Sequence, residues 1–544
     1  MNLEKLLSDA GIEYRAVGPT DIEISAIVSD SRRVCNNCLF LCIRGIKNDS
    51  HRYIGDVCAA GAAAVAVEDD GEHALPHTPA GVTIIYTKDT RAALARLWYA
   101  RYELRTAGRM RLVAVTGTNG KTTVSYMLRS IFGAAMHRCG IIGTVRCETP
   151  LAVLDTRGDA RFRPDDENAN MTTPDPGQLY RMLAAMRDDG AEYVFMEATS
   201  HALALRKLEP LHFAAAVITN LTPEHLDFHG TMEDYFLAKA RILRQSDVAV
   251  INADDPWCER FVAYAEENGC PCAVNGKMIL CSAGRPLFKS TRCECFTAEN
   301  VRDLGSEGIS YTLCTPHGIR AIRCPTPGTF TVMNSLEAAA CAITLGVSGG
   351  FVADALAASS GTPGRLERVR LGAGFPASVF IDYAHTPDAL ENLLRTARGI
   401  LDARAACRGV HEGRLVLVFG CGGDRDRRKR PEMGRIASRM ADYTYITSDN
   451  SRTEDPEEII KEIMSGFDPS APHETVTDRR TAIRRAVISA ERGDIILLAG
   501  KGHEQYEIDA SGRHEFREAD IVRAAAADLK RTGVSDDESE DKRK

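Results

Sequence analysis

The sequence predicts an α/β protein built from three domains, and three observations carry this prediction. The chain has 544 residues, more than one hydrophobic core usually holds, since domains typically contain about 50 to 250 residues. Its hydrophobic content of 44% and charged content of 26% are those of an ordinary globular protein. Short apolar runs alternate with helix-like segments along most of the chain, a pattern typical of parallel sheets that helices cover on both faces.

The N-terminal domain is predicted to span residues 1–106. Helix-like and strand-like pieces alternate there, and Gly61-Ala-Ala-Ala-Val-Ala-Val67 has the composition of a buried strand that follows a helix. The segment 101–111 is basic and contains Gly108, so we predict that it links this domain to the next.

The central domain is predicted to span residues 107–361. Its near-continuous apolar runs, flanked by helix-like segments, indicate a parallel sheet that is buried on both faces. We predict strands at 112–115, 193–196, 214–218 and 248–251. A more polar stretch at 270–325, which carries several cysteines, is predicted to be an antiparallel insertion.

The C-terminal domain is predicted to span residues 362–532 and to be Rossmann-like. It begins after Gly361-Thr-Pro-Gly364, a turn-forming segment. We predict its strands at 379–381, 415–419, 443–446 and 495–498. Residues 533–544 form a charged tail, which we predict to be disordered because it cannot bury apolar surface.

Composition limits the partners. A formal net charge of −8 gives no sign of binding to nucleic acid or to anionic membranes. The chain has no uninterrupted apolar stretch of about 18 residues, and its first residues lack a basic region followed by an apolar run. We therefore expect a cytoplasmic protein without a nucleic-acid or membrane partner.

The 17 cysteines are scattered among predicted strands and helices, which fits reduced thiols better than a disulfide framework. Cys35 and Cys38 have the spacing of a metal-binding pair, but no second pair accompanies them. The denser group at 270–295 has C-x-C spacings that differ from those of common zinc ribbons. We predict that most of these cysteines are small buried hydrophobes, with a local metal site as the alternative.

The most informative motif is Gly117-Thr-Asn-Gly-Lys-Thr-Thr123, which follows an apolar strand and opens a helix. Glycines allow the backbone to curl so that its N–H groups and the helix N-terminus point at phosphate oxygens, while Lys121 supplies positive charge. Thr122 is placed to bind Mg²⁺. The loop is shorter than the usual G-x-x-x-x-G-K-[ST] pattern, because its first glycine stands three residues before Gly120. This difference argues against an ordinary GTPase or kinase.

Further polar residues follow the predicted strands, where ligands of parallel sheets collect. Glu197 and His225 are candidate magnesium ligands in the central domain. A second metal ion would need more anionic ligands than these residues supply. Lys239 lies on a predicted helix, and its residue type alone favours a position at the surface.

Taken in order, these motifs resemble the Mur ligases, ATP-dependent amide-forming enzymes of peptidoglycan precursor synthesis. The resemblance covers nearly the whole chain, and its remaining motifs include Glu197-Ala-Thr-Ser-His-Ala-Leu203, Asn220-Leu-Thr-Pro-Glu-His-Leu-Asp-Phe-His-Gly230, Gly364-Arg-Leu-Glu-Arg-Val369 and Asp382-Tyr-Ala-His-Thr-Pro-Asp-Ala-Leu390. Three further segments resemble the MurE branch, which adds the third amino acid to UDP-N-acetylmuramoyl-L-alanyl-D-glutamate: Gly420-Cys-Gly-Gly-Asp-Arg-Asp426, Ser448-Asp-Asn-Ser-Arg-Thr-Glu-Asp-Pro456 and Gly500-Lys-Gly-His-Glu504.

The resemblance implies roles for individual residues. It changes the expectation for Lys239, which in the family is carbamylated and becomes a carboxylate-like magnesium ligand. The implied catalytic residues are Lys121, Glu197, His225 and Lys239, and the implied metal ligands are Thr122, Glu197, His225 and Lys239. The implied ATP-binding residues are Gly117, Thr118, Asn119, Gly120, Lys121, Thr122, Thr123, Asn334, Arg365 and Asp382.

The other implied sites bind the two substrates that are joined. The residues that resemble UDP-sugar-peptide contacts are Ser31, Thr172, Thr173, Thr199 and Lys207. Those that resemble contacts to the amino acid, meso-diaminopimelate, are Arg425, Asn450, Arg452, Gly500 and Glu504. An arginine suits a carboxylate and a glutamate suits an ammonium, so Arg452 and Glu504 are expected to read the zwitterionic far end of diaminopimelate. L-Lysine carries no carboxylate there.

Four positions depart from the family pattern. Ser451 stands where diaminopimelate enzymes usually have proline, which leaves L-lysine or another diamino acid as an alternative substrate. Thr199 replaces a serine, Lys207 stands near a usual arginine, and Asp49-Ser50-His51 replaces Asp-Gly-His. An ordinary structural interpretation also stays open, in which Ser31 caps a turn and the two threonines cap a helix before Gln178.

The implied reaction passes the γ-phosphoryl group of ATP to a substrate carboxylate, and the incoming amine then displaces phosphate from the acyl phosphate. Two alternatives remain from the sequence. A folylpolyglutamate synthetase shares the loop and the chemistry, and a nucleotide-driven switch would share only the loop. The resemblance also implies a monomer.

Overall fold

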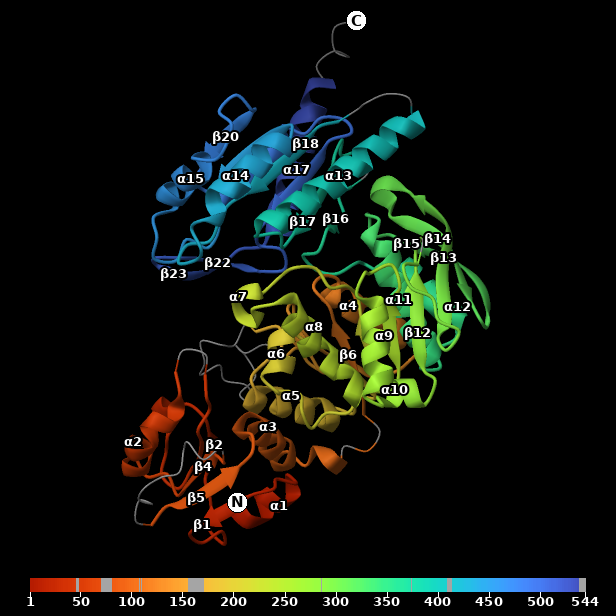
Figure 1. The fold of residues 1–544 in the computed structure, drawn as a ribbon. Coiled ribbons are helices and arrows are strands. Elements are labelled where there is room, and N and C mark those ends of the chain that lie inside the picture. The colour runs from red at the N-terminus through yellow and green to blue at the C-terminus, as the bar shows by residue number, and fades with distance from the viewer. Residues whose placement is uncertain are drawn as a thin grey trace, which may run out of the picture. The chain divides into compact units, whose positions relative to one another are not determined.

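Strands and helices alternate along the chain, as the sequence predicts, in a computed structural model that describes residues 1–45, 48–69, 81–106, 108, 110–154, 171–284, 286–372, 374–408 and 413–537 (Figure 1). The chain separates into two compact units. The first contains Met1–Cys281, Pro286–Cys295 and Ala340–Val347, and the second contains Ser282–Arg285, Phe296–Ala339 and Ser348–Lys544. The boundaries that we predict at residues 106 and 361 stay predictions.

The N-terminal part of the first unit is a sheet with helices on both faces. Its strands lie in the order β1-β5-β4-β3-β2, and all pair in parallel except β1, which is antiparallel to β5. Alternate side chains of a strand point to opposite faces. Leu39 and Leu41 accordingly pack with α1 and α3, while Phe40 packs with α2. The bounds are α1 Leu3–Asp9, β1 Arg15–Val17, β2 Ile27–Val28, β3 Leu39–Leu41, α2 Ile54–Ala59, β4 Ala64–Glu68, β5 Thr83–Thr87 and α3 Thr90–Arg101.

The central part of the first unit contains the predicted parallel sheet. Its strands lie in the order β12-β11-β10-β6-β9-β7-β8, with β8 alone antiparallel to its neighbour. Strand β6 pairs with β10 on one side and β9 on the other, so the segments after these three strands emerge together. The strand bounds are β6 Arg111–Thr116, β7 Cys139–Ile142, β8 Cys147–Glu148, β9 Tyr193–Glu197, β10 Ala215–Ile218, β11 Ala249–Asn252 and β12 Met278–Ser282.

Helices of the first unit follow the strands in the expected alternation. Their bounds are α4 Lys121–Ala134, α5 Pro176–Asp188, α6 Ser200–Ala204, α7 Leu226–His229, α8 Met232–Ala240, α9 Cys258–Glu267 and α10 Pro271–Val274. Their apolar side chains, among them Leu179, Leu183 and Phe261, join one buried cluster with alternate residues of the sheet. This cluster packs the helices against the sheet, and the polar residues lie in the loops that follow the strands.

The predicted antiparallel insertion is confirmed only in its second half. Residues Pro271–Val274 form α10, and β12 pairs in parallel with β11. The antiparallel part consists of β13 Glu294–Asp303, β14 Ile309–Thr315 and β15 Gly318–Cys324. The polar composition of the whole stretch concealed this change, since β12 itself is the buried apolar run Met278–Ser282. The helices α11 Phe330–Thr344 and α12 Gly349–Ala358 follow.

The C-terminal part of the second unit has the predicted Rossmann-like sheet, in the order β16-β17-β21-β18-β19-β20, parallel except at β16. Helices α13, α14 and α15 cover one face of it (Figure 1), and residues of α16 and α17 pack in the core cluster on the other face. The bounds are β16 Glu367–Val369, β17 Ser378–Asp382, α13 Pro387–Arg408, β18 Leu415–Phe419, α14 Lys429–Met440, β19 Tyr443–Thr447, α15 Pro456–Met464, β20 His473–Val476, α16 Arg479–Ile488, β21 Ile495–Ala499, β22 Tyr506–Asp509, β23 Gly512–Glu515 and α17 Glu518–Asp537.

The last helix overlaps the tail that we predict to be disordered. Helix α17 continues to Asp537, so the first residues of that tail are helical, and residues 538–544 lie outside the described residues.

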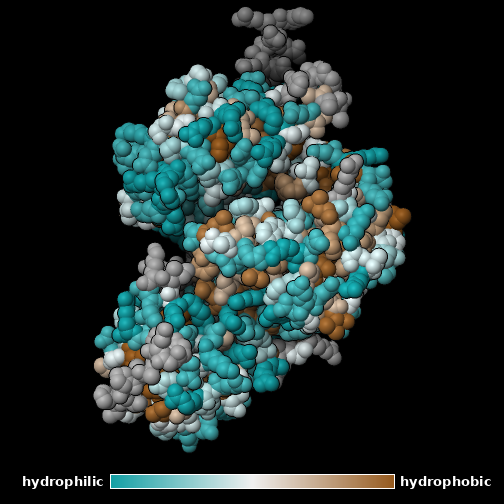
Figure 2. Space-filling model, viewed as in Figure 1, coloured by the Kyte–Doolittle hydropathy of each residue, from teal (hydrophilic) through white to brown (hydrophobic). Residues whose placement is uncertain are grey.

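The surface in Figure 2 is mainly hydrophilic, with hydrophobic residues scattered over it. Within the part of the chain that the structure describes, no helix is long and apolar enough to cross a membrane. The cysteines of that part are free thiols, as the sequence predicts, and most of them are buried or half-buried. Neither Cys35 and Cys38 nor the group at 270–295 belongs to a cluster of three metal-binding side chains in the described residues.

A buried ion pair joins the two helices that cover the second face of the C-terminal sheet. Arg479 of α16 donates from Nε to Glu518 Oε1 of α17 over 2.8 Å, and both side chains are buried. The same guanidinium donates to the carbonyl of Ala499 over 2.9 Å and to that of Ser448 over 3.2 Å. This arginine therefore ties the ends of β21 and β19 to both helices.

Replacing Glu518 by glutamine is expected to destabilise this region by about 3 kcal/mol, because it leaves the Arg479 charge buried without a partner. Hydrogen exchange of the β21 amides measures the effect. The matched control is Asp528→Asn, which removes the exposed pair that Asp528 forms with Arg484 between the same helices at 2.8 Å. It should cost less than about 1 kcal/mol. Equal losses in the two variants would contradict this account.

Candidate nucleotide and amino-acid sites

The glycine-lysine-threonine loop joins β6 to α4 as predicted. Gly117 and Gly120 have φ angles of 145° and 87°, which L side chains rarely adopt. A Cβ atom at Gly117 would lie 1.9 Å from Thr219 Oγ1, so the loop needs glycine there for space as well. Gly120 is the residue before α4, whose N-terminal N–H groups point out of the helix into the loop. The arrangement offers backbone donors and a helix N-terminus to an anion.

Lys121 holds the loop in this shape. Its Nζ donates to the carbonyl of Gly117 over 2.9 Å and to that of Thr118 over 2.8 Å. The ammonium group thus lies against the loop that a phosphate group would occupy, which agrees with the predicted role of this lysine.

Glu197 is buried at the end of β9, and three groups donate to its carboxylate. Thr122 Oγ1 lies 3.0 Å from Oε2, Thr144 Oγ1 lies 3.0 Å from Oε2, and the Thr144 N–H lies 2.9 Å from Oε1. Gly143 permits this approach, since a Cβ atom there would lie 2.2 Å from Glu197 Oε1. Carboxylate and hydroxyl oxygens at one point form a donor set that suits Mg²⁺.

Lys239 is buried, so the surface position that its residue type favours is wrong. Its side chain is 1% exposed, and its Nζ donates to the Gly117 carbonyl over 2.8 Å. The Nζ also lies 4.7 Å from the centre of the Tyr235 ring. Burial, and secondly the charge of Lys121, hold the pKa of Lys239 well below its usual range. The lysine therefore reaches the phosphate loop with an amine that readily loses its proton.

His225 lies at the start of α7, on the segment that leads to the helix carrying Lys239. It has a φ of 56°, and its side chain is 46% exposed. Its ring lies 4.8 Å from the ring of His201, which in turn lies 5.6 Å from His229. Burial lowers the pKa of His201, and burial with the charge of His201 lowers that of His229 to about 4.

Three of the predicted sugar-peptide residues, Thr172, Thr173 and Thr199, lie together near Glu197, and a fourth, Lys207, forms an ion pair with Asp175. Thr172 and Thr173 lie beside Glu197, because the Thr172 hydroxyl is 2.9 Å from Thr144 Oγ1 and Thr173 Oγ1 donates to the Glu197 carbonyl over 2.7 Å. Thr199 Oγ1 lies 3.1 Å from Thr173 Oγ1 and caps α6. Lys207 is buried and pairs with Asp175 at 2.7 Å.

The alternative interpretation, in which Ser31 caps a turn and Thr172 and Thr173 cap a helix, is wrong. Asp175 is the residue before α5, and neither threonine of the pair caps that helix. In the N-terminal domain the cap of the turn at 31–33 is Asp30, which accepts from the Arg32 N–H over 3.0 Å, and Ser31 begins the turn. Ser50, at a position where the family has glycine, donates its hydroxyl to the Ile43 carbonyl over 2.9 Å.

The remaining ATP-binding candidates lie in the second unit. Asp382, at the end of β17, accepts from the N–H groups of Leu366 and Ala384 over 2.7 and 2.8 Å. Burial raises the pKa of this carboxyl, although the nearby Arg365 charge lowers it. The Arg365 guanidinium lies 5.2 Å from the centre of the Tyr383 ring. Asn334 is buried in α11.

The amino-acid candidates meet where β18, β19 and β21 end. Asn450 Nδ2 donates to Glu504 Oε2 over 2.8 Å. Arg452 has a φ of 54° and donates to the carbonyls of Gly423 and Asn450 over 2.8 and 3.2 Å. Burial, and secondly the charge of Asp449, raise the pKa of Glu504.

Two glycines give this site its shape. A Cβ atom at Gly422 would lie 3.0 Å from an Arg452 nitrogen and 3.7 Å from Arg425 Cγ, so both arginines pass beside this residue. Gly500 has a φ of 116°, and a Cβ atom there would lie 2.5 Å from Asp449 Oδ2. All five predicted amino-acid residues therefore lie around one set of strand ends.

Sequence reasoning missed Thr144 and Lys501. Thr144 follows β7 in the same way that Glu197 follows β9, but the short run of Cys139–Ile142 did not predict a strand. Lys501 is buried between the two glycines of Gly500-Lys-Gly-His-Glu504, and it donates to Asn450 Oδ1 over 2.9 Å.

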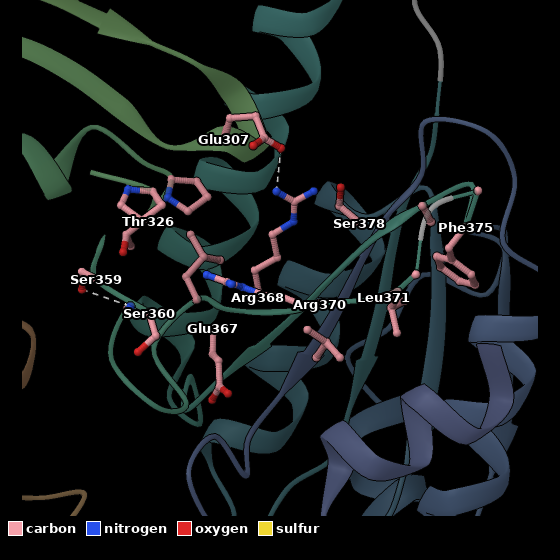
Figure 3. A pocket seen from close by; sticks show the side chains of 18 residues that line it. Glu307, Thr326, Ser359, Ser360, Glu367, Arg368, Arg370, Leu371, Phe375 and Ser378 are labelled. Carbon is pink, nitrogen blue, oxygen red and sulfur yellow. Dashed lines mark hydrogen bonds and ion pairs between the residues drawn. The ribbon is translucent and has the colours of Figure 1, made fainter. Parts of the chain in front are cut away.

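A polar cavity of about 490 Å³ lies elsewhere in the second unit (Figure 3). Arg368 crosses it to pair with Glu307 at 2.6 Å, and Ser359 and Arg370 also line it. None of the predicted site residues lines this cavity. We therefore place the candidate chemistry at the strand ends and not in the cavity.

Comparison with known proteins agrees with this arrangement. Residues 23–102 match the Mur ligase family, catalytic domain, residues 115–342 match the Mur ligase middle domain, and residues 364–502 match the Mur ligase glutamate ligase domain. A UDP-N-acetylmuramoyl-L-alanyl-D-glutamate--2,6-diaminopimelate ligase of Syntrophomonas wolfei is 38% identical over 98% of this chain and 100% of its own length. The chain belongs to the Mur ligase family.

Two further comparisons support this family membership. An enzyme with the same name from Chlorobaculum tepidum is 39% identical over 93% of each chain. A solved structure of a UDP-N-acetylmuramoyl-L-alanyl-D-glutamate--2,6-diaminopimelate ligase has a TM-score of 0.66 and 30% identity, and the match covers 97% of this chain and 99% of that one. The predicted class, an ATP-dependent ligase, is thereby confirmed, and the nucleotide-switch alternative falls away.

Thr144→Val should lower kcat of this Mur ligase about 10- to 100-fold, because it removes the hydroxyl that orients the Glu197 carboxylate. Steady-state kinetics across a range of Mg²⁺ concentrations provide the measurement. Thr144→Ser keeps the hydroxyl and serves as the control, with activity within about threefold of the native protein. Equal activity of the valine and serine variants would show that this hydrogen bond has no role.

Proposed function

We propose that this Mur ligase joins meso-diaminopimelate to the D-glutamyl side-chain carboxylate of UDP-N-acetylmuramoyl-L-alanyl-D-glutamate, with ATP as the energy source, in peptidoglycan precursor synthesis. The observation that carries the proposal is the pairing of opposite charges around Asn450. Its side-chain amide donates a hydrogen bond to Glu504, and its main-chain carbonyl accepts one from the Arg452 guanidinium. An anion and a cation held by one residue suit the ammonium and carboxylate at the far end of diaminopimelate.

The nucleotide contacts follow from the loop. The N–H groups of Gly117–Thr123 and the charge of Lys121 bind the phosphates, and Asn334, Arg365 and Asp382 are the further ATP-binding residues of this proposal. In this proposal Lys121 also stabilises the charge that develops on the transferred phosphoryl group.

Magnesium ions complete the nucleotide site, with Thr122, Glu197, His225 and Lys239 as the residues that hold them. Bound Mg²⁺ neutralises charge on the phosphate oxygens during transfer. Glu197 supplies one carboxylate and His225 an imidazole, so a second metal ion would need a further anionic group. A carboxylated Lys239 supplies it.

Lys239 is suited to carboxylation. Burial holds its pKa well below the usual range, which favours the neutral amine. The lone pair of that amine bonds the carbon of CO₂, and the nitrogen then releases one proton. The product, a carbamate, keeps one N–H group. That N–H would keep the hydrogen bond to the Gly117 carbonyl, and the new carboxylate would supply oxygen ligands for Mg²⁺.

The reaction has two steps. A carboxylate oxygen of the D-glutamyl side chain attacks the γ-phosphorus of ATP, the bond to the β-phosphate oxygen breaks, and ADP leaves. The neutral amine of diaminopimelate then attacks the acyl carbon, a tetrahedral intermediate forms, and phosphate departs as the nitrogen loses a proton. Exclusion of water protects the acyl phosphate between the steps.

Ser31, Thr172, Thr173, Thr199 and Lys207 bind the UDP-sugar peptide in this proposal. The Thr144 hydroxyl donates to Glu197 and lies within hydrogen-bond distance of the Thr172 hydroxyl, which supports the proposal because the two contacts connect the proposed metal ligand to a proposed substrate contact. The substrates are water-soluble, and we place the reaction in the cytoplasm and expect a monomer.

Arg452→Ala is expected to raise the KM for meso-diaminopimelate about 10- to 100-fold, since a charge-assisted hydrogen bond is lost. The assay is phosphate release with ATP, Mg²⁺ and the UDP-dipeptide. Arg428→Ala is the control, because it removes an exposed arginine that pairs with Asp426 just before α14, and it should not alter KM. If the native protein prefers L-lysine to diaminopimelate, the proposed substrate is contradicted. The serine at position 451, where diaminopimelate enzymes usually have proline, would then be the residue to examine for the changed preference.

Lys239→Met should lower kcat more than about 100-fold, since a metal ligand is lost. Isotope-labelled bicarbonate should give a carbamate NMR signal in the native protein that is absent from this variant. A fully active methionine variant, or native protein without the signal, would exclude carboxylation as part of the mechanism.

A further inference from the structure

The Asn450 side chain has its oxygen and nitrogen in fixed places. Its Oδ1 accepts from Lys501 Nζ over 2.9 Å and from the Ile508 N–H over 2.9 Å, and its Nδ2 donates to Glu504 Oε2 over 2.8 Å. A reversed amide would place an NH₂ group against two donors and an oxygen against a carboxylate. The surroundings therefore determine which end of the amide faces the amino-acid site.

Lys501 is the side chain that enforces this orientation from the protein interior. It is 0% exposed, donates to the Tyr506 carbonyl over 3.0 Å and lies 3.8 Å from Asp449 Oδ1. Burial alone raises the pKa of Asp449, but the charges of Lys501 and Arg479 outweigh burial and bring it below its usual range. Lys501 and Asp449 thus form a buried ion pair beside Asn450.

The backbone on both sides of Lys501 has little freedom to move. Gly500 and Gly502 have φ angles of 116° and 53°, and a Cβ atom at Gly502 would lie 2.6 Å from Tyr383 Cβ. Lys501 therefore lies between two glycines whose backbone passes close to Asp449 and Tyr383.

We propose that Lys501 is a positioning residue that sets the preference of the enzyme for a carboxylate-bearing amino acid. The inference rests on the proposed function and deepens it. An amide nitrogen has two protons, and the bond to Glu504 uses one of them. The other proton is then directed at the ligand carboxylate together with Arg452. Without Lys501 the amide loses one of the two donors to Oδ1 and is held less firmly, with the Ile508 N–H and Glu504 remaining. An oxygen that faced the ligand carboxylate would repel it, whereas L-lysine has no carboxylate to repel.

The test compares Lys501→Met with the native enzyme in the phosphate-release assay. We expect the KM for meso-diaminopimelate to rise about 10- to 100-fold, while kcat at saturation and the KM for ATP change less than about threefold. The ratio of kcat/KM for diaminopimelate to that for L-lysine should fall by a similar factor. Lys461→Met, the same change at an exposed lysine paired with Glu458 on α15, is the matched control and should leave the ratio unchanged.

A double-mutant cycle tests whether Lys501 acts through Asn450. In an Asn450→Ala background, Lys501→Met should change the KM for diaminopimelate less than about twofold, because no amide remains to be oriented. Additive effects would overturn the proposal, as would an unchanged substrate ratio or a parallel loss of kcat with every substrate.

Two further outcomes need their own tests: a Lys501→Met variant that does not fold, and native protein that does not use diaminopimelate. If Lys501→Met does not fold, Asn450→Asp keeps the lysine and presents oxygen on both sides, so it must reproduce the selective rise in KM for the proposal to stand. Native protein that does not use diaminopimelate overturns the proposed function together with this inference, whereas native turnover with diaminopimelate and an unchanged ratio in the variants overturns the inference alone.

Discussion

The carbonyl oxygen of Gly117 is the point on which the nucleotide site depends. It accepts hydrogen bonds from the amines of Lys121 and Lys239, which come from two different helices. Two amines at one oxygen repel each other when both are charged, and this repulsion adds to burial in lowering the pKa of Lys239. The loop that we propose for phosphate binding thus also holds the buried amine of Lys239 beside that of Lys121.

A comparable constraint holds the amino-acid site, where charges are buried in pairs. Asp449 and Lys501 lie at the ends of β19 and β21, and Arg479 and Glu518 connect the same strand ends to two helices. Buried ion pairs add little net stability compared with apolar packing, but each partner becomes costly to remove. The network therefore contributes a fixed geometry, which a site that distinguishes two similar diamino acids requires.

The sequence predicted the parts of the fold that depend on local pattern. Apolar runs gave the strands β6, β9, β10 and β11 and the four main strands of the C-terminal sheet, since strands buried on both faces need such runs. It failed at β12, where polar neighbours masked an apolar strand, and at Thr144, because the strand before it, Cys139–Ile142, contains a glycine and only two strongly apolar residues.

Site residues show the same division between local and tertiary information. The glycines of the phosphate loop follow from backbone geometry alone, and their positive φ angles were predictable. The burial of Lys239 and of Lys501 was not, because a lysine side chain carries no local signal for its environment, and only the tertiary fold brings each one to its acceptor. Family resemblance replaced that missing information for Lys239, and nothing replaced it for Lys501.

The central claim is that the loop directs the γ-phosphoryl group of ATP onto the D-glutamyl side-chain carboxylate. It is tested most directly by labelling that carboxylate with a heavy oxygen isotope and following the label through one turnover with diaminopimelate. The account predicts that one labelled oxygen appears in the released phosphate, because an acyl phosphate carries it there. Phosphate without the label, with all of the label retained in the peptide product, would contradict the acyl-phosphate route.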